Sequence, residues 1–97
     1  MHLTKEQINQ FDKDGYLFFP NLFSQEEVKG MSSEVPKLYE IREEYNFREK
    51  GSDLVRTNFA AHMYSKPFAK LARHPRMIKP VEDLLGEKLY MHQFKIK

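Results

Sequence analysis

The chain has 97 residues, of which 40% are apolar and 31% are charged, and its formal net charge is +2. This composition fits a soluble globular protein and argues against disorder. Because the chain has no cysteine, disulfide frameworks, thiolate zinc sites and cysteine nucleophiles are excluded. The longest apolar run, Tyr16–Pro20, is too short to span a membrane, and Met1–Gln10 lacks the apolar core of a signal peptide. We therefore expect a cytoplasmic protein with no membrane partner.

The first predicted element is a helix that begins at about Lys5. Thr4 and Gln7 have the spacing of a capping box, in which each side chain satisfies a free backbone N–H of the first turn. Gly15 is suited to end this helix because glycine readily adopts the left-handed conformation. The next residues, Tyr16–Phe19, are predicted to form a short strand that is ended by the following proline.

A second capping box, Ser24 with Glu27, predicts the start of a longer helix. Apolar residues then recur at the three- and four-residue spacing of one buried helix face: Val28, Met31, Val35 and Leu38. Pro36 lies within this stripe and removes a backbone donor. We therefore expect a kink there, with the stripe resuming as far as Ile41.

The second half of the chain is predicted to alternate between extended segments and helices. Glu43–Asp53 is highly charged and is expected to be a loop, whereas Leu54–Phe59 is expected to be extended. Proline in the first turn predicts a short helix from Ser65. A further helix is expected to restart at Pro75 and to close at Gly86.

The last segment, Lys88–Lys97, shows the alternation that is typical of a strand. The predicted order is therefore helix, strand, long helix, loop, strand, two helices and strand. This order indicates an α+β fold in which helices pack outside a sheet that has barely begun. Because an unpaired apolar edge strand is a liability in a complete domain, we expect this chain to be an incomplete part of one.

The histidines do not form a recognisable metal site. None is followed two residues later by Asp or Glu, as in many non-heme iron sites, and no His-Glu-x-x-His zinc motif occurs. We expect packing or exposure for all of them: His2, His62, His74 and His92.

The sequence also indicates no serine nucleophile, because Ser24 and Ser65 are explained as helix caps and no Gly-x-Ser-x-Gly turn occurs. The basic residues within Lys66–Lys79 favour a solvated helix face, so no nucleic-acid partner is expected.

One pair of polar residues on the last predicted strand has two interpretations. Gln93 and Lys95 lie two residues apart, so their side chains point to the same face of a strand. An amide and an ammonium group on one face could hold a small carboxylate through hydrogen bonds and charge. They could equally be the polar side chains that protect an edge strand from further pairing.

Four stretches of the chain follow one another in a recognisable order. They are Leu3–Gln7 with Asp14–Leu17 and Pro20; Leu22–Val28; Val55-Arg56 with Phe59 and His62; and His74–Arg76 with Leu84–Gly86 and Tyr90–Ile96. Together they cover nearly the whole chain. In this order they resemble the N-terminal region of the phytanoyl-CoA dioxygenase family, which includes ectoine hydroxylase-like enzymes.

This resemblance implies a double-stranded β-helix (jelly-roll) fold, with residues 1–97 as the N-terminal segment of a single domain whose barrel is incomplete. It implies iron(II) and 2-oxoglutarate as cofactor and cosubstrate of the full-length protein, and a small molecule as its substrate. It also implies that Gln93 and Lys95 face the 2-oxoglutarate or substrate pocket and that Phe59 lines it. Arg56 is either a pocket residue or an ion-pair partner.

The family's His-x-Asp motif, distal histidine and 2-oxoglutarate-binding arginine lie beyond the region that this chain resembles. Lys97 also stands where the family commonly has Asn. We therefore expect the chain alone to bind no cofactor and to be inactive. A second hypothesis is a non-catalytic binding or assembly module that a partner chain completes. In that case the exposed last strand would pair with a partner's sheet edge or with another copy.

Overall fold

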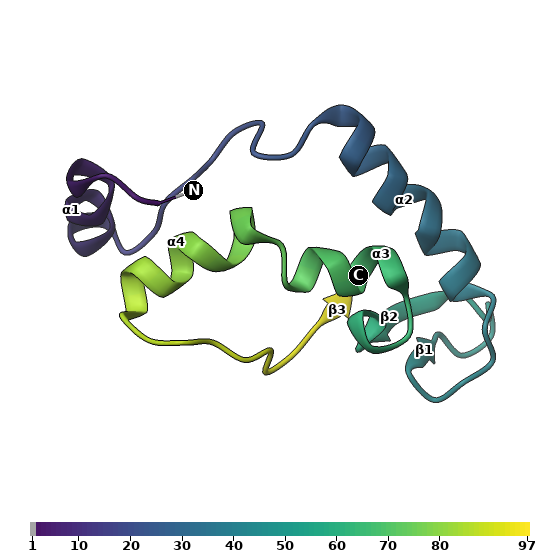
Figure 1. The fold of residues 1–97 in the computed structure, drawn as a ribbon. Coiled ribbons are helices and arrows are strands. Elements are labelled where there is room, and N and C mark those ends of the chain that lie inside the picture. Colours follow the sequence, from purple (N-terminus) through teal and green to yellow (C-terminus); the bar gives the residue numbers. More distant parts are fainter. Residues whose placement is uncertain (1) are drawn as a thin grey trace.

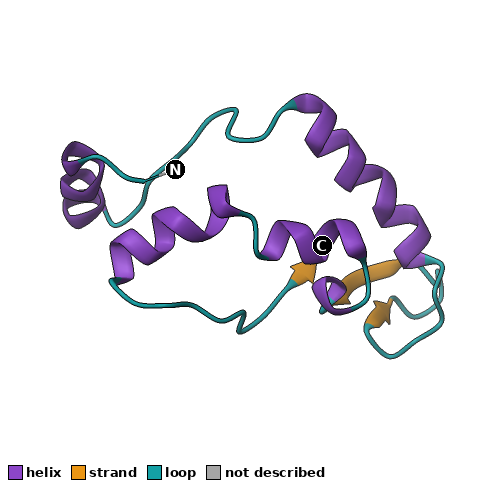
Figure 2. Cartoon of the chain, in the orientation of Figure 1, coloured by secondary structure: helices purple, strands orange, loops and turns teal. Residues whose placement is uncertain are grey.

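The computed structural model describes residues 2–97, and within them it has the α+β composition that the sequence predicts. The elements follow in the order α1 (Lys5–Asp14), α2 (Gln25–Tyr39), β1 (Asn46–Arg48), β2 (Val55–Phe59), the 3₁₀ helix η1 (Ala61–Met63), α3 (Lys66–Ala72), α4 (Pro75–Leu85) and β3 (Lys95–Ile96). The strands form one antiparallel sheet in the order β1-β2-β3, as Figure 2 shows. None of the helices within residues 2–97 combines the length and apolar character that crossing a bilayer requires.

The chain has an open shape, with the sheet, α3 and the end of α2 gathered at one end and α1 at the other (Figure 1). Its radius of gyration is 16.1 Å, whereas a compact domain of this length has about 13 Å. Its accessible surface is 7832 Å², whereas a compact monomer of the same mass exposes about 5,800 Å². A large apolar area therefore has no cover from residues 2–97.

The start of the chain forms the predicted capped helix but not the predicted strand. Thr4 Oγ1 accepts from the Gln7 backbone N–H at 3.2 Å, and the Thr4 N–H donates to Gln7 Oε1 at 2.9 Å. Gly15 ends α1 with a φ of 80°. The strand predicted over Tyr16–Phe19 is wrong, because these residues belong to the drawn-out connection between α1 and α2. A strand needs a neighbour with which to pair, and residues 2–97 supply none there.

Helix α2 begins at the predicted capping box, since Ser24 Oγ accepts from the Glu27 N–H at 3.1 Å and the Ser24 N–H donates to Glu27 Oε1 at 2.8 Å. The helix passes through Pro36 and ends at Tyr39. It therefore stops two residues short of Ile41, where the sequence predicted that the apolar stripe would end.

The sheet differs from prediction at both of its outer strands. β1 lies within Glu43–Asp53, which was wrongly predicted to be a loop, because pairing with β2 outweighs its charged composition. β2 confirms the predicted extended segment. The strand predicted over Lys88–Lys97 is reduced to Lys95–Ile96. Its pairing stops where β2 stops, because Ala60 turns the chain away with a φ of 61°.

Helices α3 and α4 begin with proline near the first turn, as predicted. However, Ser65 does not cap α3 with its side chain, since its hydroxyl donates instead to Glu34 Oε1 at 3.3 Å. His74 caps α4, because its Nδ1 accepts from the Arg76 backbone N–H at 3.1 Å. Gly86 closes α4 in the left-handed conformation, as expected.

The core is small, and its buried side chains are both apolar and polar. Its buried apolar residues are Leu38, Ala61 and Phe68, and its buried polar residues are Asn46, Thr57, Asn58 and Ser65. Asn58, which is fully buried, donates through Nδ2 to Asn46 Oδ1 at 2.6 Å and accepts from the Tyr64 hydroxyl at 2.8 Å. Asn46 Nδ2 in turn donates to the Leu38 and Ile41 carbonyls at 2.6 and 2.8 Å. This amide chain joins the end of α2 to the middle of the sheet.

A second polar link joins the other end of α2 to α4. The Arg76 guanidinium donates to the Leu22 carbonyl at 2.7 Å and to both carboxylate oxygens of Glu27. It also lies over the Phe23 ring, with its central carbon 4.6 Å from the ring centroid. The hydrogen bond from Arg76, followed by that from the Ser24 N–H, lowers the pKa of Glu27 from its ordinary 4.5 to about 2.

The amide chain predicts a large effect of Asn58→Ala on stability. This change leaves the buried Asn46 Oδ1 without a donor, which costs about 1–3 kcal/mol. It also removes one of the two acceptors of the Tyr64 hydroxyl, which keeps only the Phe59 carbonyl at 3.1 Å. We expect urea unfolding to show a loss of about 2–4 kcal/mol, whereas Asn9→Ala, at an exposed position on α1, should cost less than about 0.5 kcal/mol. Equal losses for the two variants would contradict the structural role of the amide chain.

The Arg76–Glu27 link predicts a specific pH dependence. Because the folded carboxyl has a lowered pKa, the stabilisation from this pair is complete above about pH 4.5 and is lost as the pH falls toward 2. In Arg76→Gln, we expect the Glu27 pKa to rise toward 4.5 and this part of the acid destabilisation to disappear. A carbon-detected NMR titration of the Glu27 carboxyl measures the pKa directly. An unchanged Glu27 pKa in the variant would show that Arg76 does not set it.

Candidate functional site

Two of the three predicted site residues are brought together by the sheet. Phe59 is the last residue of β2, and its register partner across the antiparallel ladder is Lys95 of β3. Lys95 Nζ lies over the Phe59 ring, 5.8 Å from the ring centroid, which is within the range of a cation–π contact. Phe59 is 40% exposed and Lys95 is exposed, so both remain accessible to a ligand. Residues far apart in the sequence thus form one cationic and aromatic surface, here called the Phe59–Lys95 pair.

Gln93, the third predicted residue, is not aligned by the same ladder. It lies two residues before Lys95, outside the paired part of β3, and its side chain is exposed. Arg56, for which the sequence left two roles open, has its Nε 3.8 Å from Glu49 Oε1, and both side chains are more than half exposed. This geometry favours the ion-pair interpretation for Arg56.

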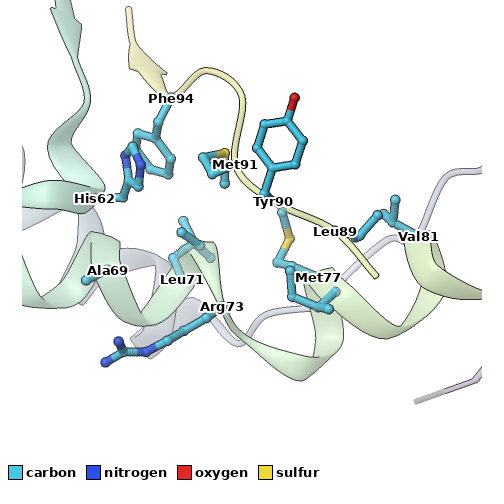
Figure 3. A pocket seen from close by; sticks show the side chains of 12 residues that line it. His62, Ala69, Leu71, Arg73, Met77, Val81, Leu89, Tyr90, Met91 and Phe94 are labelled. Carbon is cyan, nitrogen blue, oxygen red and sulfur yellow. The ribbon is translucent and has the colours of Figure 1, made fainter. Parts of the chain in front are cut away.

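A cavity that the sequence did not predict lies beside the segment that carries Gln93 and Lys95. It has a volume of about 490 Å³ and lies between α3, α4 and residues 89–94. Its lining is mainly apolar and includes Leu71, Met77, Val81, Leu89, Met91 and Phe94. In Figure 3, Arg73 and the Tyr90 hydroxyl point away from the apolar side chains. The apolar stripe of α4 and the alternation after Gly86 were the available signals for this cavity.

His62 was predicted to have a packing or an exposed role, and its ring packs against Phe94, the residue directly before β3. Its ring stacks on the ring of Phe94, with centroids 5.1 Å apart and an interplanar angle of 30° (Figure 3). His62 Nδ1 is buried and makes no hydrogen bond within the described part of the chain. Phe94 comes between Gln93 and Lys95 in the sequence and directly before β3, so this contact lies next to two of the predicted site residues.

The described residues do not fit an iron site by themselves. Within residues 2–97, no group of three His, Asp or Glu side chains is placed so that it could hold a metal ion. The Phe59–Lys95 pair, by contrast, offers an ammonium group, which suits a carboxylate ligand. The pair is thus an exposed cationic and aromatic surface, and residues 2–97 do not gather a metal-binding group beside it.

Comparison with known proteins gives relatives along almost the whole chain. A family model described as phytanoyl-CoA dioxygenase (PhyH) matches residues 11–97. Ectoine dioxygenase from Bordetella bronchiseptica is 35% identical over 95 residues, which are 94% of this chain and 31% of the relative. Ectoine dioxygenase from Nocardia farcinica is 37% identical over 95 residues, covering 94% and 32%. L-proline trans-4-hydroxylase from Streptomyces griseoviridis is 28% identical over 87 residues, covering 90% and 32%.

The solved structures agree with these sequence relatives. EctD from S. alaskensis with bound Fe matches with a TM-score of 0.87 and 28% identity, over 96% of this chain and 34% of that one. The same protein with 2-oxoglutarate and 5-hydroxyectoine matches with a TM-score of 0.84. The chain therefore spans about a third of the length of its relatives, and the expected fold, part of a double-stranded β-helix dioxygenase, is confirmed. Because the family model matches most of the sequence, this chain belongs to the phytanoyl-CoA dioxygenase (PhyH) family.

Proposed function

We propose that this chain is the N-terminal segment of a single iron(II)- and 2-oxoglutarate-dependent dioxygenase domain that hydroxylates a small molecule. The family match and the likeness to EctD structures with Fe and with 2-oxoglutarate support this function. The names of the relatives, ectoine dioxygenase and L-proline trans-4-hydroxylase, support a small organic substrate. The iron ligands would come from outside residues 2–97, because these residues do not gather a metal-binding group.

The observation that carries the proposal is the Phe59–Lys95 pair. Its ammonium group is exposed and lies over an aromatic ring on the neighbouring strand of the β2–β3 ladder. 2-Oxoglutarate has two carboxylates, and an amino-acid substrate such as proline has one, so a positioned ammonium suits either ligand. We assign Gln93 to the same ligand site, because its exposed amide lies two residues before Lys95 and can donate a further hydrogen bond.

The large solvent-exposed surface of the chain supports the same proposal. The chain exposes 7832 Å², about 2,000 Å² more than a compact monomer of its mass. The exposed large apolar residues include Tyr16 at 63%, Phe18 at 79% and Leu85 at 63%. An excess of this size is expected when the part of a domain that covers this surface is absent. In the proposed protein, the remaining two thirds of the fold would bury it.

A second candidate function is an assembly module without catalysis of its own. The observation that favours it is β3, which pairs with β2 along one edge and has no other strand beside it within residues 2–97. A partner's strand, or β3 of another copy, would extend the sheet there. Sedimentation of the chain tests this second candidate. An assembly module should sediment as a defined oligomer or complex, whereas a monodisperse monomer would count against self-association.

The proposed function predicts that residues 1–97 can replace the matching third of a working relative. A chimera that joins them to the remainder of S. alaskensis EctD should consume 2-oxoglutarate and convert ectoine to 5-hydroxyectoine. In this chimera, Lys95→Met removes the ammonium group and should lower kcat/KM by about tenfold to a hundredfold, the value of a charged hydrogen bond. Product formation is measured by chromatography.

A matched control for this substitution is Lys50→Met, which makes the same chemical change at an exposed position between β1 and β2. Its kcat/KM should stay within about twofold of the unsubstituted chimera, as is usual for a surface change. Equal activity of the Lys95→Met and Lys50→Met chimeras would remove Lys95 from the site. A folded but inactive chimera would count against the proposed function as a whole.

A further inference from the structure

Phe94 has the opposite burial to its two neighbours in sequence. Gln93 and Lys95 are exposed, whereas Phe94 is half-buried and packs against the core cluster of Leu38 and Phe68. This alternation is that of a strand with one covered face. The orientation of Gln93 and Lys95 toward a ligand therefore depends on Phe94 facing the core.

The β2–β3 ladder alone is too short to fix this orientation firmly. Only two register pairs are formed, Asn58 with Ile96 and Phe59 with Lys95. A slip of one residue would turn every side chain of the strand to the other face, and would place Phe94 outside and Lys95 against the core. Something in addition to the ladder must therefore hold the register.

Three contacts hold Phe94 in place, and all come from residues that follow β2. His62 stacks on one side of its ring at 5.1 Å, and Phe68 meets it edge-on at 5.7 Å with an interplanar angle of 69°. The Ala60 N–H donates to the Phe94 carbonyl at 2.8 Å. The side chain and the backbone of the same residue are thus held at once, which leaves the strand little freedom to slip.

We propose that His62 is a positioning residue of the candidate site: by stacking on Phe94, it sets the register that places Lys95 over Phe59 and turns Gln93 to the same open side. The role of this placement in ligand binding rests on the proposed function, but the placement itself can be measured without a ligand. His62 Nδ1 makes no hydrogen bond within residues 2–97. Its contribution is therefore the flat face of its ring, which a phenyl ring also has.

The test compares His62→Leu with His62→Phe in the chain itself. Leucine fills the space without a flat ring, whereas phenylalanine preserves the stack. Met31→Ala is the control, because Met31 packs against the same core cluster from α2, whereas His62 stacks on Phe94. Circular dichroism first establishes a temperature at which all variants are folded.

Two NMR observations read out the position of the strand. The ring current of Phe59 shifts the side-chain protons of Lys95 upfield as long as the ammonium group lies over the ring. The exchange rate of the Ala60 amide reports on its bond to Phe94. We expect His62→Leu to reduce the Lys95 shift by more than half and to speed Ala60 exchange by about twofold to tenfold, the range for loss of one aromatic pair.

We expect His62→Phe and Met31→Ala to retain the Lys95 shift. If His62→Leu also retains it, or if Met31→Ala loses it equally, His62 does not position the strand and the inference is overturned. A 2-oxoglutarate titration of the EctD chimera that carries His62→Phe separates this question from the proposed function. An intact Lys95 shift without 2-oxoglutarate binding would leave the positioning role standing and count against the ligand.

Discussion

The hydrogen bond between the side chains of Asn58 and Asn46 is the contact on which the ordered end of this molecule depends. A helix leaves its last carbonyls without intrahelical partners, and Asn46 donates to one of them, the Leu38 carbonyl of α2, and to the Ile41 carbonyl just beyond the helix. Asn58, near the end of the middle strand β2, then donates to Asn46 and accepts from Tyr64 just beyond the sheet. Because Phe59 follows Asn58 directly, the buried amide chain also determines where the candidate site begins.

From this point outward the structure becomes progressively less constrained. The sheet end has a core, an amide network and aromatic contacts to Phe94, whereas α1 has no buried residue and is tied to α4 mainly through bonds from Leu3 and His2 to Asp83. The Phe59–Lys95 pair thus lies at the end of the chain that holds the core and the amide chain. Seven of the thirteen large apolar residues that are exposed lie on the connection to α2, on α4 and on the segment before β3, and the others include Phe47, Leu54 and Met63 near the sheet. This distribution is the physical basis for regarding the chain as one wall of a larger dioxygenase domain.

Local features of the fold could be predicted from the sequence, and non-local ones could not. Both capping boxes and the glycine ends of α1 and α4 were predicted correctly, because each depends on residues within four positions. Tyr16–Phe19 and β1 were predicted wrongly, because strand formation depends on a distant partner rather than on composition. The same limit applies to the site. Lys95 was named from its strand spacing to Gln93 and Phe59 through the family resemblance. The contact of His62 with Phe94, however, joins segments that no local pattern connects.

The central claim is that the open apolar face is completed by the rest of the family's fold. Hydrogen exchange of the Tyr16–Phe19 amides tests it most directly, in the chain alone and in its chimera with the remainder of S. alaskensis EctD. These residues alternate between exposed and half-buried side chains but pair with no strand within residues 2–97. The account predicts rapid exchange in the chain alone and strong protection in the chimera, as the segment gains a neighbouring strand. Equally rapid exchange in a folded chimera would contradict it.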